Sequence, residues 1–244
     1  MAAYKVGYFV GSLSSTSINR ELSQVLIRLA PEDLEFTEIP IGNLPLYSPD
    51  YDANYPPEAV AFKNAIRQSD AVLFVTPEYN RSIPGALKNA IDWASRPWGQ
   101  NAFDHIPAGV IGASVGQIGT AVAQQSLRGV LGFCNARQMT APEAYIHFTP
   151  EVFPGDGEVT NESTRDFLKR YMAEFRDHVV RVLTVLPRGS RRVGIDPHLA
   201  QLVRAHGGRT SRRAGRRSAR CLRRPGRGSR PRRRCAPRAA PQPR

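Results

Sequence analysis

The sequence predicts an α/β protein whose core is a doubly wound parallel sheet of five strands, with helices on both faces. Short apolar runs alternate along the chain with amphipathic stretches of about 10–15 residues, which is the pattern of βαβ units. Most of these apolar runs are continuous, as expected for strands that are covered on both faces. With 244 residues, the chain is long enough to bury a substantial core.

The five predicted strands are short apolar runs bounded by glycine, proline or polar residues. The clearest lies in the stretch DAVLFVTPEYN, where Pro77 ends it because proline cannot donate to a sheet ladder. In chain order, the predicted strands cover residues 4–10, 34–41, 71–76, 105–114 and 137–140. The stretch 45–56 is a long, irregular loop rich in Tyr and Pro.

The predicted helices show apolar residues at helical spacing, with proline as start and stop signal. The first is apolar at positions 18, 22, 25, 26 and 29, and Pro31 follows it. Pro57 and Pro84 open the second and third, at the first turn, where a missing N–H costs nothing. The predicted helices cover residues 18–30, 57–68, 84–95, 119–131 and 161–186.

Charge divides the chain into a domain, residues 1–187, and a tail, residues 188–244. The whole chain has a net charge of +13, but the tail holds 19 Arg and a single acid, whereas the domain has 15 basic and 20 acidic groups. The tail lacks every aromatic residue and cannot build a core, so we expect it to be disordered. Its residues are those of GC-rich codons, which suggests translation out of frame or past the natural stop.

The remaining composition points to a cytoplasmic protein without metal or membrane segment. The three cysteines (Cys134, Cys221 and Cys235) form neither a metal-ligand pattern nor a disulfide framework, as suits a reducing compartment. No run approaches the roughly 20 apolar residues of a membrane span, and the N-terminus lacks the features of a signal peptide. The five histidines are scattered, and no catalytic triad is evident.

The stretch GSLSSTSINREL, at 11–22, follows the first strand and is crowded with hydroxyl side chains. In an open parallel sheet, ligands bind beyond the carboxyl ends of the strands. A strand-to-helix loop there offers main-chain N–H groups and the positive end of a helix dipole. The loop therefore predicts an anion site made of neutral donors. An ordinary serine-rich turn, with Ser17 capping the helix, is the alternative.

The loop contains no lysine, which limits the kinds of phosphate group that it could bind. Neither G-x-x-x-x-G-K-[ST] nor G-x-G-x-x-G is present, which argues against nucleoside triphosphate chemistry and against a Rossmann dinucleotide site. A pocket lined with hydroxyl groups suits a single phosphate monoester, such as that of FMN.

Two more strand ends carry loops of the same kind. In TPEYNRSIPGALKNAIDW, at 76–93, Tyr79 and Asn80 follow Pro77 and can place N–H groups beside a flat heteroaromatic ring. Glu78 could serve this site or be a structural carboxylate. In SVGQIG, Gly116 allows a ligand to approach the backbone closely.

Together these three segments resemble the NADPH-dependent FMN reductase family, in particular its chromate and quinone reductase branch. The resemblance rests on GSLSSTSINREL, on TPEYNRSIPGALKNAIDWASRP and on SVGQIG with the following SLR, and it runs from about residue 5 to about residue 185. It implies a flavodoxin-like fold with strand order 2-1-3-4-5. It also implies one FMN per subunit, with NADPH or NADH as reductant.

Site residues follow from the resemblance, position by position. It implies that the first loop holds the phosphate, that the second lines the isoalloxazine and that the third closes the far side. The cofactor-binding residues expected are Gly11, Ser12, Ser14, Ser17, Ile18, Asn19, Pro77, Glu78, Tyr79, Asn80, Ser114, Gly116 and Gln117. Ser14 stands where the family usually has a basic residue, and Arg81 could substitute in part.

The resemblance implies that the flavin carries the chemistry, with no catalytic side chain. Hydride passes from the nicotinamide to flavin N5 and on to quinones, chromate, azo compounds or free flavin, in a ping-pong cycle. It further implies a homodimer or homotetramer in which a neighbouring subunit covers the ring, with Arg128 and Glu143 pairing across an interface. Candidates for the cover or for dimer packing are Tyr47, Tyr51, Tyr55, Trp93 and Trp98.

Two other functions remain open from the residues alone. One is an electron carrier of flavodoxin type, without nicotinamide turnover. The other is nucleic-acid binding through the arginine-rich tail, although that tail has no aromatic residues for base stacking. FMN retention followed by oxidation of NADPH with a quinone separates the three.

Overall fold

The computed structural model describes residues 3–187, and the structural statements below concern that part of the chain. The predictions made for the tail, residues 188–244, lie outside the described residues. The predicted domain boundary at residue 187 coincides with the end of the described residues and is therefore not tested. No helix in the described part combines the length and the apolar character that a membrane crossing requires.

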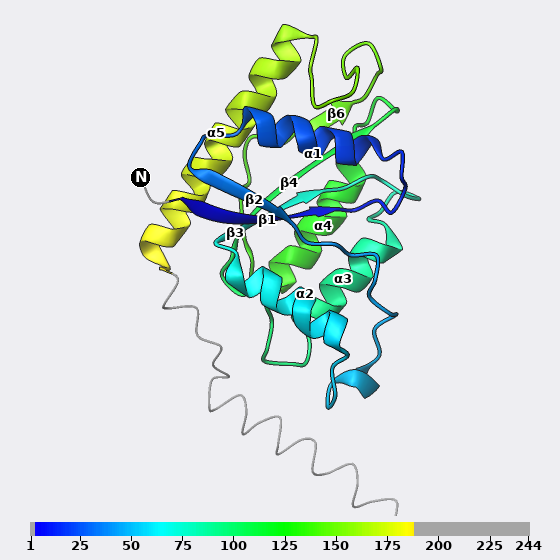
Figure 1. The fold of residues 1–244 in the computed structure, drawn as a ribbon, viewed down its shortest axis with the longest axis vertical. Coiled ribbons are helices and arrows are strands. Elements are labelled where there is room, and N and C mark those ends of the chain that lie inside the picture. Colours follow the sequence, from blue (N-terminus) through cyan, green and yellow to red (C-terminus); the bar gives the residue numbers. More distant parts are fainter. Residues whose placement is uncertain (1–2, 188–244) are drawn as a thin grey trace, which may run out of the picture. The chain divides into compact units, whose positions relative to one another are not determined.

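The sheet is parallel throughout and has the order β2-β1-β3-β4-β5, which confirms the predicted fold class (Figure 1). Its central strand, β3, is buried at every residue, because helices cover both faces. The strand bounds are β1 Tyr4–Val10, β2 Leu34–Glu38, β3 Ala71–Val75, β4 Pro107–Ser114 and β5 Arg137–Gln138.

A sixth strand, β6 (Tyr145–His147), is absent from the sequence-based prediction. It pairs with the end of β4 from Gly112 to Ser114, whereas β5 pairs with the start of the same strand. Two short strands thus share the last position of the sheet. The short strand predicted at 137–140 is β5, whereas β6 spans only three residues, too few for a hydrophobic period to show in the sequence.

The helices form two layers, one on each face of the sheet (Figure 1). Helices α1 (Ile18–Leu29) and α5 (Glu162–Val185) cover one face, where Tyr171 and Phe175 are fully buried. The opposite layer consists of α2 (Pro57–Gln68), α3 (Gly85–Ser95) and α4 (Ala121–Phe133). All five predicted helices are therefore present, with ends that differ from the prediction by at most two residues.

The stretch between β2 and α2 packs onto α3 instead of projecting into solvent. Tyr47 and Tyr55 meet the ring of Trp93 edge-on, at centroid distances of 5.2 and 5.1 Å. The indole Nε1 of Trp93 donates to the Pro45 carbonyl at 2.7 Å. Because Trp93 has no exposed surface, the expectation that it covers a neighbouring flavin or packs at a dimer contact is wrong. Tyr51, in the one-turn helix η1 (Pro49–Tyr51), is 39% exposed.

Candidate functional site

Three loops meet at one edge of the sheet, where β1, β3 and β4 end side by side (Figure 1). In the strand register, Val10 lies opposite Val75, and Val75 lies opposite Ile111. Two hydrogen bonds of 2.9 Å continue the pairing into the loops, from Gly11 N–H to the Val75 carbonyl and from Thr76 N–H to the Ile111 carbonyl. The loops predicted to form a site are thus brought together.

Two glycines permit the close approach of these segments. A Cβ on Gly112 would lie 2.1 Å from the Thr76 carbonyl oxygen, so only glycine allows the end of β3 to lie against β4. Gly119 has a φ of +58°, and a Cβ there would lie 2.5 Å from the Tyr145 carbonyl carbon. Side chains at these positions would push apart the loops that form the edge.

In the first loop, residues 11–19, serine hydroxyl groups accept hydrogen bonds from the main chain of the loop itself. Ser14 N–H donates to Ser12 Oγ and Thr16 N–H donates to Ser14 Oγ, each at 3.2 Å. Ser17 caps α1 by accepting from the main chain of Arg20 at 3.3 Å, as the turn-and-cap alternative predicts. Several main-chain N–H groups of the loop have no acceptor within residues 3–187, namely those of Ser12, Leu13, Ser15, Ser17, Ile18 and Asn19.

Capping and anion binding are compatible in this loop. Three of the six N–H groups, those of Ser17, Ile18 and Asn19, lie at the positive end of α1, where an anion satisfies donors that the helix itself cannot. The nearest cation, Arg20, is already paired through two hydrogen bonds of 2.7 and 2.9 Å with Glu38, whose carboxylate raises the pKa of the guanidinium. The loop can therefore hold an oxyanion mainly through neutral donors.

The side chain of Asn19 links the first loop to the third strand end. It is 1% exposed, and its Nδ2 donates to the Ala113 carbonyl while its Oδ1 accepts from Ala113 N–H, both at 2.9 Å. This reciprocal pair uses the amide oxygen and one of the two amide hydrogens. Asn19 thereby fixes the start of α1 against β4.

The second loop contains a tight hairpin. Tyr79 and Ser82 exchange two main-chain hydrogen bonds of 3.0 Å, and the two residues between them, Asn80 and Arg81, have φ values of 51° and 62°. Asparagine adopts this left-handed region more readily than most residues, which is one reason for its place in the turn. The ring of Tyr79 is 50% exposed and so remains available to a ligand.

Glu78 uses its carboxylate to hold the second loop to α4. Its Oε2 accepts from the N–H groups of Val122 and Ala123, both at 3.0 Å, and its Oε1 accepts from Arg81 at 3.4 Å. The N-cap residue of α4, Thr120, provides no side-chain cap of its own. The carboxylate of Glu78 therefore has a structural role, which was one of the two alternatives for this residue. The main-chain N–H of Glu78 has no acceptor within residues 3–187.

The third loop is held from β6, a contact that the sequence did not reveal. Ser114 Oγ accepts from Gly116 N–H at 3.1 Å, and the Ser114 carbonyl accepts from Phe148 N–H at 2.8 Å. His147 Nε2 lies 3.1 Å from the Val115 carbonyl. The sequence did not indicate that His147 lies beside the third loop, because the strand that carries it, β6, was not predicted.

Exposed apolar side chains surround the three loops. Besides Tyr79, which was expected here, they include three residues that were not predicted for the site, Leu13, Val115 and Ile118, which are 62%, 73% and 46% exposed. They adjoin predicted site residues and could have been noted as apolar positions in otherwise polar loops. The edge thus combines polar main-chain donors with an apolar rim, as a cofactor with a charged tail and a flat ring requires. Within residues 3–187, no cluster of His, Cys, Asp and Glu could hold a metal ion.

Known proteins with this architecture match in sequence as well as in fold. The family model described as NADPH-dependent FMN reductase matches residues 4–151. A 2-hydroxy-1,4-benzoquinone reductase from a Burkholderia species is 48% identical over 173 residues, covering 71% of this chain and 94% of that protein. A quinone reductase from Pseudomonas putida is 46% identical, covering 72% of this chain and 95% of its own length. The solved structure of a flavoenzyme NAD(P)H:(acceptor) oxidoreductase from Paracoccus denitrificans superposes with a TM-score of 0.71 at 46% identity, covering 73% and 98% of the two chains.

Proposed function

Because this chain belongs to the NADPH-dependent FMN reductase family, we propose that it is an FMN-containing, NAD(P)H-dependent quinone reductase. The observation that carries the proposal is the meeting of three donor-rich loops at one sheet edge, in a chain nearly half identical to quinone reductases. When bound, FMN supplies the hydride chemistry, taking two electrons from the nicotinamide and passing them to the acceptor.

The first loop fits the phosphate of FMN. Its six unpartnered N–H groups and its hydroxyls form a neutral cradle at the positive end of α1. Asn19 contributes its main-chain N–H, and its side chain keeps the cradle in place through Ala113. The phosphate-binding residues proposed are Gly11, Ser12, Ser14, Ser17, Ile18 and Asn19.

The other two loops fit the flat ring. Glu78 offers its N–H while its carboxylate anchors the loop to α4, so the ring-binding main chain is fixed in position. The exposed ring of Tyr79 gives an apolar surface for stacking. The ring-binding residues proposed are Pro77, Glu78, Tyr79 and Asn80 in the second loop, with Ser114, Gly116 and Gln117 in the third.

The chain's residues bind and orient, and no side chain of the site acts as nucleophile or proton donor in this proposal. Nicotinamide and acceptor occupy the same exposed side of the edge in turn, which gives ping-pong kinetics. Further acceptors proposed are chromate, azo compounds and free flavin. We also propose a cytoplasmic homodimer or homotetramer, with Tyr51 and Trp98, which is 57% exposed, as contact residues.

A visible absorption spectrum tests the proposal directly. The purified full-length protein, loaded with FMN, should show flavin absorbance that anaerobic NADPH bleaches and that 1,4-benzoquinone restores. An electron carrier would keep the flavin but show no bleaching by NADPH. A chain that stays colourless in excess FMN would contradict the proposed site.

A further inference from the structure

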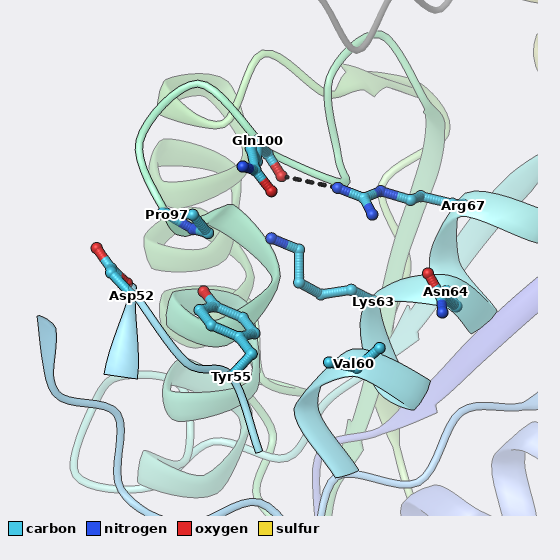
Figure 2. A pocket seen from close by; sticks show the side chains of 8 residues that line it. All are labelled: Asp52, Tyr55, Val60, Lys63, Asn64, Arg67, Pro97 and Gln100. Atoms are coloured by element: carbon cyan, nitrogen blue, oxygen red, sulfur yellow. Dashed lines mark hydrogen bonds between the residues drawn. The ribbon is translucent and has the colours of Figure 1, made fainter. Parts of the chain in front are cut away.

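A cavity lies away from the three loops, between α2 and the segment that follows α3 (Figure 2). Its volume is about 190 Å³, well above the space that one water molecule needs. Its walls come from the loop before α2, from one face of α2 and from residues 97–100. The lining residues are Asp52, Tyr55, Val60, Lys63, Asn64, Arg67, Pro97 and Gln100.

Two cations on α2 face this cavity. Lys63 and Arg67 are four residues apart and therefore lie on the same face of the helix, and Figure 2 shows both side chains extending towards the 97–100 segment. Arg67 donates to the Gln100 carbonyl at 3.4 Å. Within residues 3–187, neither cation forms an ion pair.

The burial of Lys63 is unusual for a lysine without a carboxylate partner. The residue is 4% exposed, its Nζ donates to the Arg96 carbonyl, and the ring of Tyr55 lies 5.0 Å from the ammonium. Burial, and secondarily the charge of Arg67, lowers the pKa of Lys63 to about 8, while Asp52 acts in the opposite direction. Desolvation and the repulsion from Arg67 thus destabilise the charged ammonium, and a bound anion would offset both effects.

The other lining residues are mixed in character, with the polar Asp52, Asn64 and Gln100 beside the apolar surfaces of three residues. The apolar surfaces are the Tyr55 ring, the side chain of Val60 and the ring of Pro97, and the Tyr55 hydroxyl donates to the Trp93 carbonyl at 3.2 Å. A ligand with a charged head and an apolar body therefore suits the walls better than a fully hydrated inorganic ion.

We propose that this cavity binds a small organic acid, with its carboxylate between Lys63 and Arg67 and its apolar body against Tyr55, Val60 and Pro97. The planar guanidinium matches a carboxylate in shape, and the ammonium adds a second charge-assisted hydrogen bond. This site is separate from the three loops and does not depend on the function proposed for them.

Calorimetric titration of the FMN-loaded protein with benzoate at pH 7 tests the site. We expect one benzoate per chain, with a dissociation constant on the order of 1 mM. Lys63→Met and Arg67→Met should each weaken binding at least about tenfold, because each removes a charge-assisted hydrogen bond. Lys88→Met, which removes an exposed lysine paired with Asp92 on α3, is the matched control and should leave affinity unchanged.

Affinity should also depend on pH through Lys63. The charged groups around it are Asp52, Arg67 and Arg96, together with the Tyr55 hydroxyl, whose pKa is raised by burial. Above pH 8 the free protein loses the Lys63 proton and must regain it to bind the acid, so affinity should fall by about tenfold per pH unit. In the Arg67→Met protein this dependence should persist but begin at a higher pH, because the charge of Arg67 no longer lowers the pKa of Lys63, and in the Lys63→Met protein it should vanish.

Three outcomes would overturn the proposal. The first is equal benzoate affinity in all four proteins, and the second is benzoate binding that shifts the flavin spectrum and ignores both substitutions, which would place it in the flavin site. The third is tighter binding of inorganic phosphate than of benzoate. Should Lys63→Met fail to fold, the Arg67→Met protein still decides between these outcomes.

Discussion

Single polar side chains position the loops of the proposed flavin site. Glu78 joins the second loop to the start of α4, and Asn19 joins the first loop to β4. Both make their hydrogen bonds to main-chain atoms, so the contact fixes the position of the backbone and not merely of another side chain. Their removal should therefore affect the geometry of the whole edge.

Glu78→Ala should weaken FMN binding and destabilise the protein by about 1–2 kcal/mol, since two N–H groups of α4 lose their cap. Glu78→Gln should cost less stability, because an amide oxygen can still accept from those groups. Fluorescence titration with FMN and urea unfolding measure the two effects. The exposed Glu35→Gln is the control, and equal behaviour of all three variants would disprove the positioning role.

Asn19→Ala should destabilise the protein by roughly 2–4 kcal/mol, because the N–H and the carbonyl of Ala113 both lose their partner in a buried place. Urea unfolding checks this loss, with the exposed Asn54→Ala as control. FMN affinity should fall as well, since the cradle is no longer tied to β4. Unchanged stability would show that the reciprocal pair adds nothing.

At the scale of elements, the site depends on how closely strands and loops approach one another. The end of β3 lies against β4 only because Gly112 has no side chain. The third loop is held by β6, which pairs with the last residues of β4, from Gly112 to Ser114. Without β6, the end of β4 would lack a strand partner on this side. The arrangement of the edge thus depends on the pairing of these elements and on the absence of a side chain at Gly112.

Gly112→Ala should separate the second and third loops, because the new Cβ would lie 2.1 Å from the Thr76 carbonyl oxygen. We expect lower stability and at least about tenfold weaker FMN binding, as for an overpacked core site. Gly129→Ala is the matched control, since a Cβ there meets no atom within 4 Å. Because Gly129 lies inside α4, that substitution should stabilise by about 0.5–1 kcal/mol.

At the scale of the whole molecule, one edge of the sheet provides the proposed flavin site, and the layer of α2 and α3 provides a separate cavity with two cations in its wall. The parallel sheet makes the first possible, since it directs three strand ends to one edge. The second arises where α2 and α3 pack and a lysine remains buried between them. The two sites can therefore be altered independently.

Lys63→Met should stabilise the domain at pH 7, by up to a few kcal/mol, when no organic acid is present. The pKa of Lys63 is about 8 in the folded protein and near 10.5 in the unfolded chain, so the wild type carries a penalty below pH 8. Between pH 8 and pH 10.5 Lys63 is neutral in the folded protein but still protonated in the unfolded chain. As pH rises through this range the unfolded chain loses that proton too, and the destabilisation caused by Lys63 disappears. Urea unfolding of both proteins at pH 7 and pH 10 should show this gain shrinking. A gain that stays constant with pH would contradict it.

A chain that ends at residue 187 should bind FMN and oxidise NADPH as the full chain does. Every residue proposed for the flavin site lies within residues 11–117, and the family match ends at residue 151. Spectroscopic FMN titration and NADPH–quinone turnover of both chains measure the comparison. Loss of either property on truncation would show that residues 188–244 contribute to the enzyme.

The sequence by itself determined the order and type of the long elements, the parallel sheet and the three strand ends that carry the candidate residues. These follow from hydrophobic periodicity and from proline and glycine signals, which act over a few neighbouring residues. The tertiary structure alone decided the partners: Asn19 meets Ala113 across 94 positions, Glu78 meets α4 across more than 40, and Trp93 is enclosed by the loop before α2. It also decided β6, whose three residues form a strand only because β4 offers them hydrogen bonds. Contacts of this kind depend on where the chain returns in space, and no local pattern encodes that.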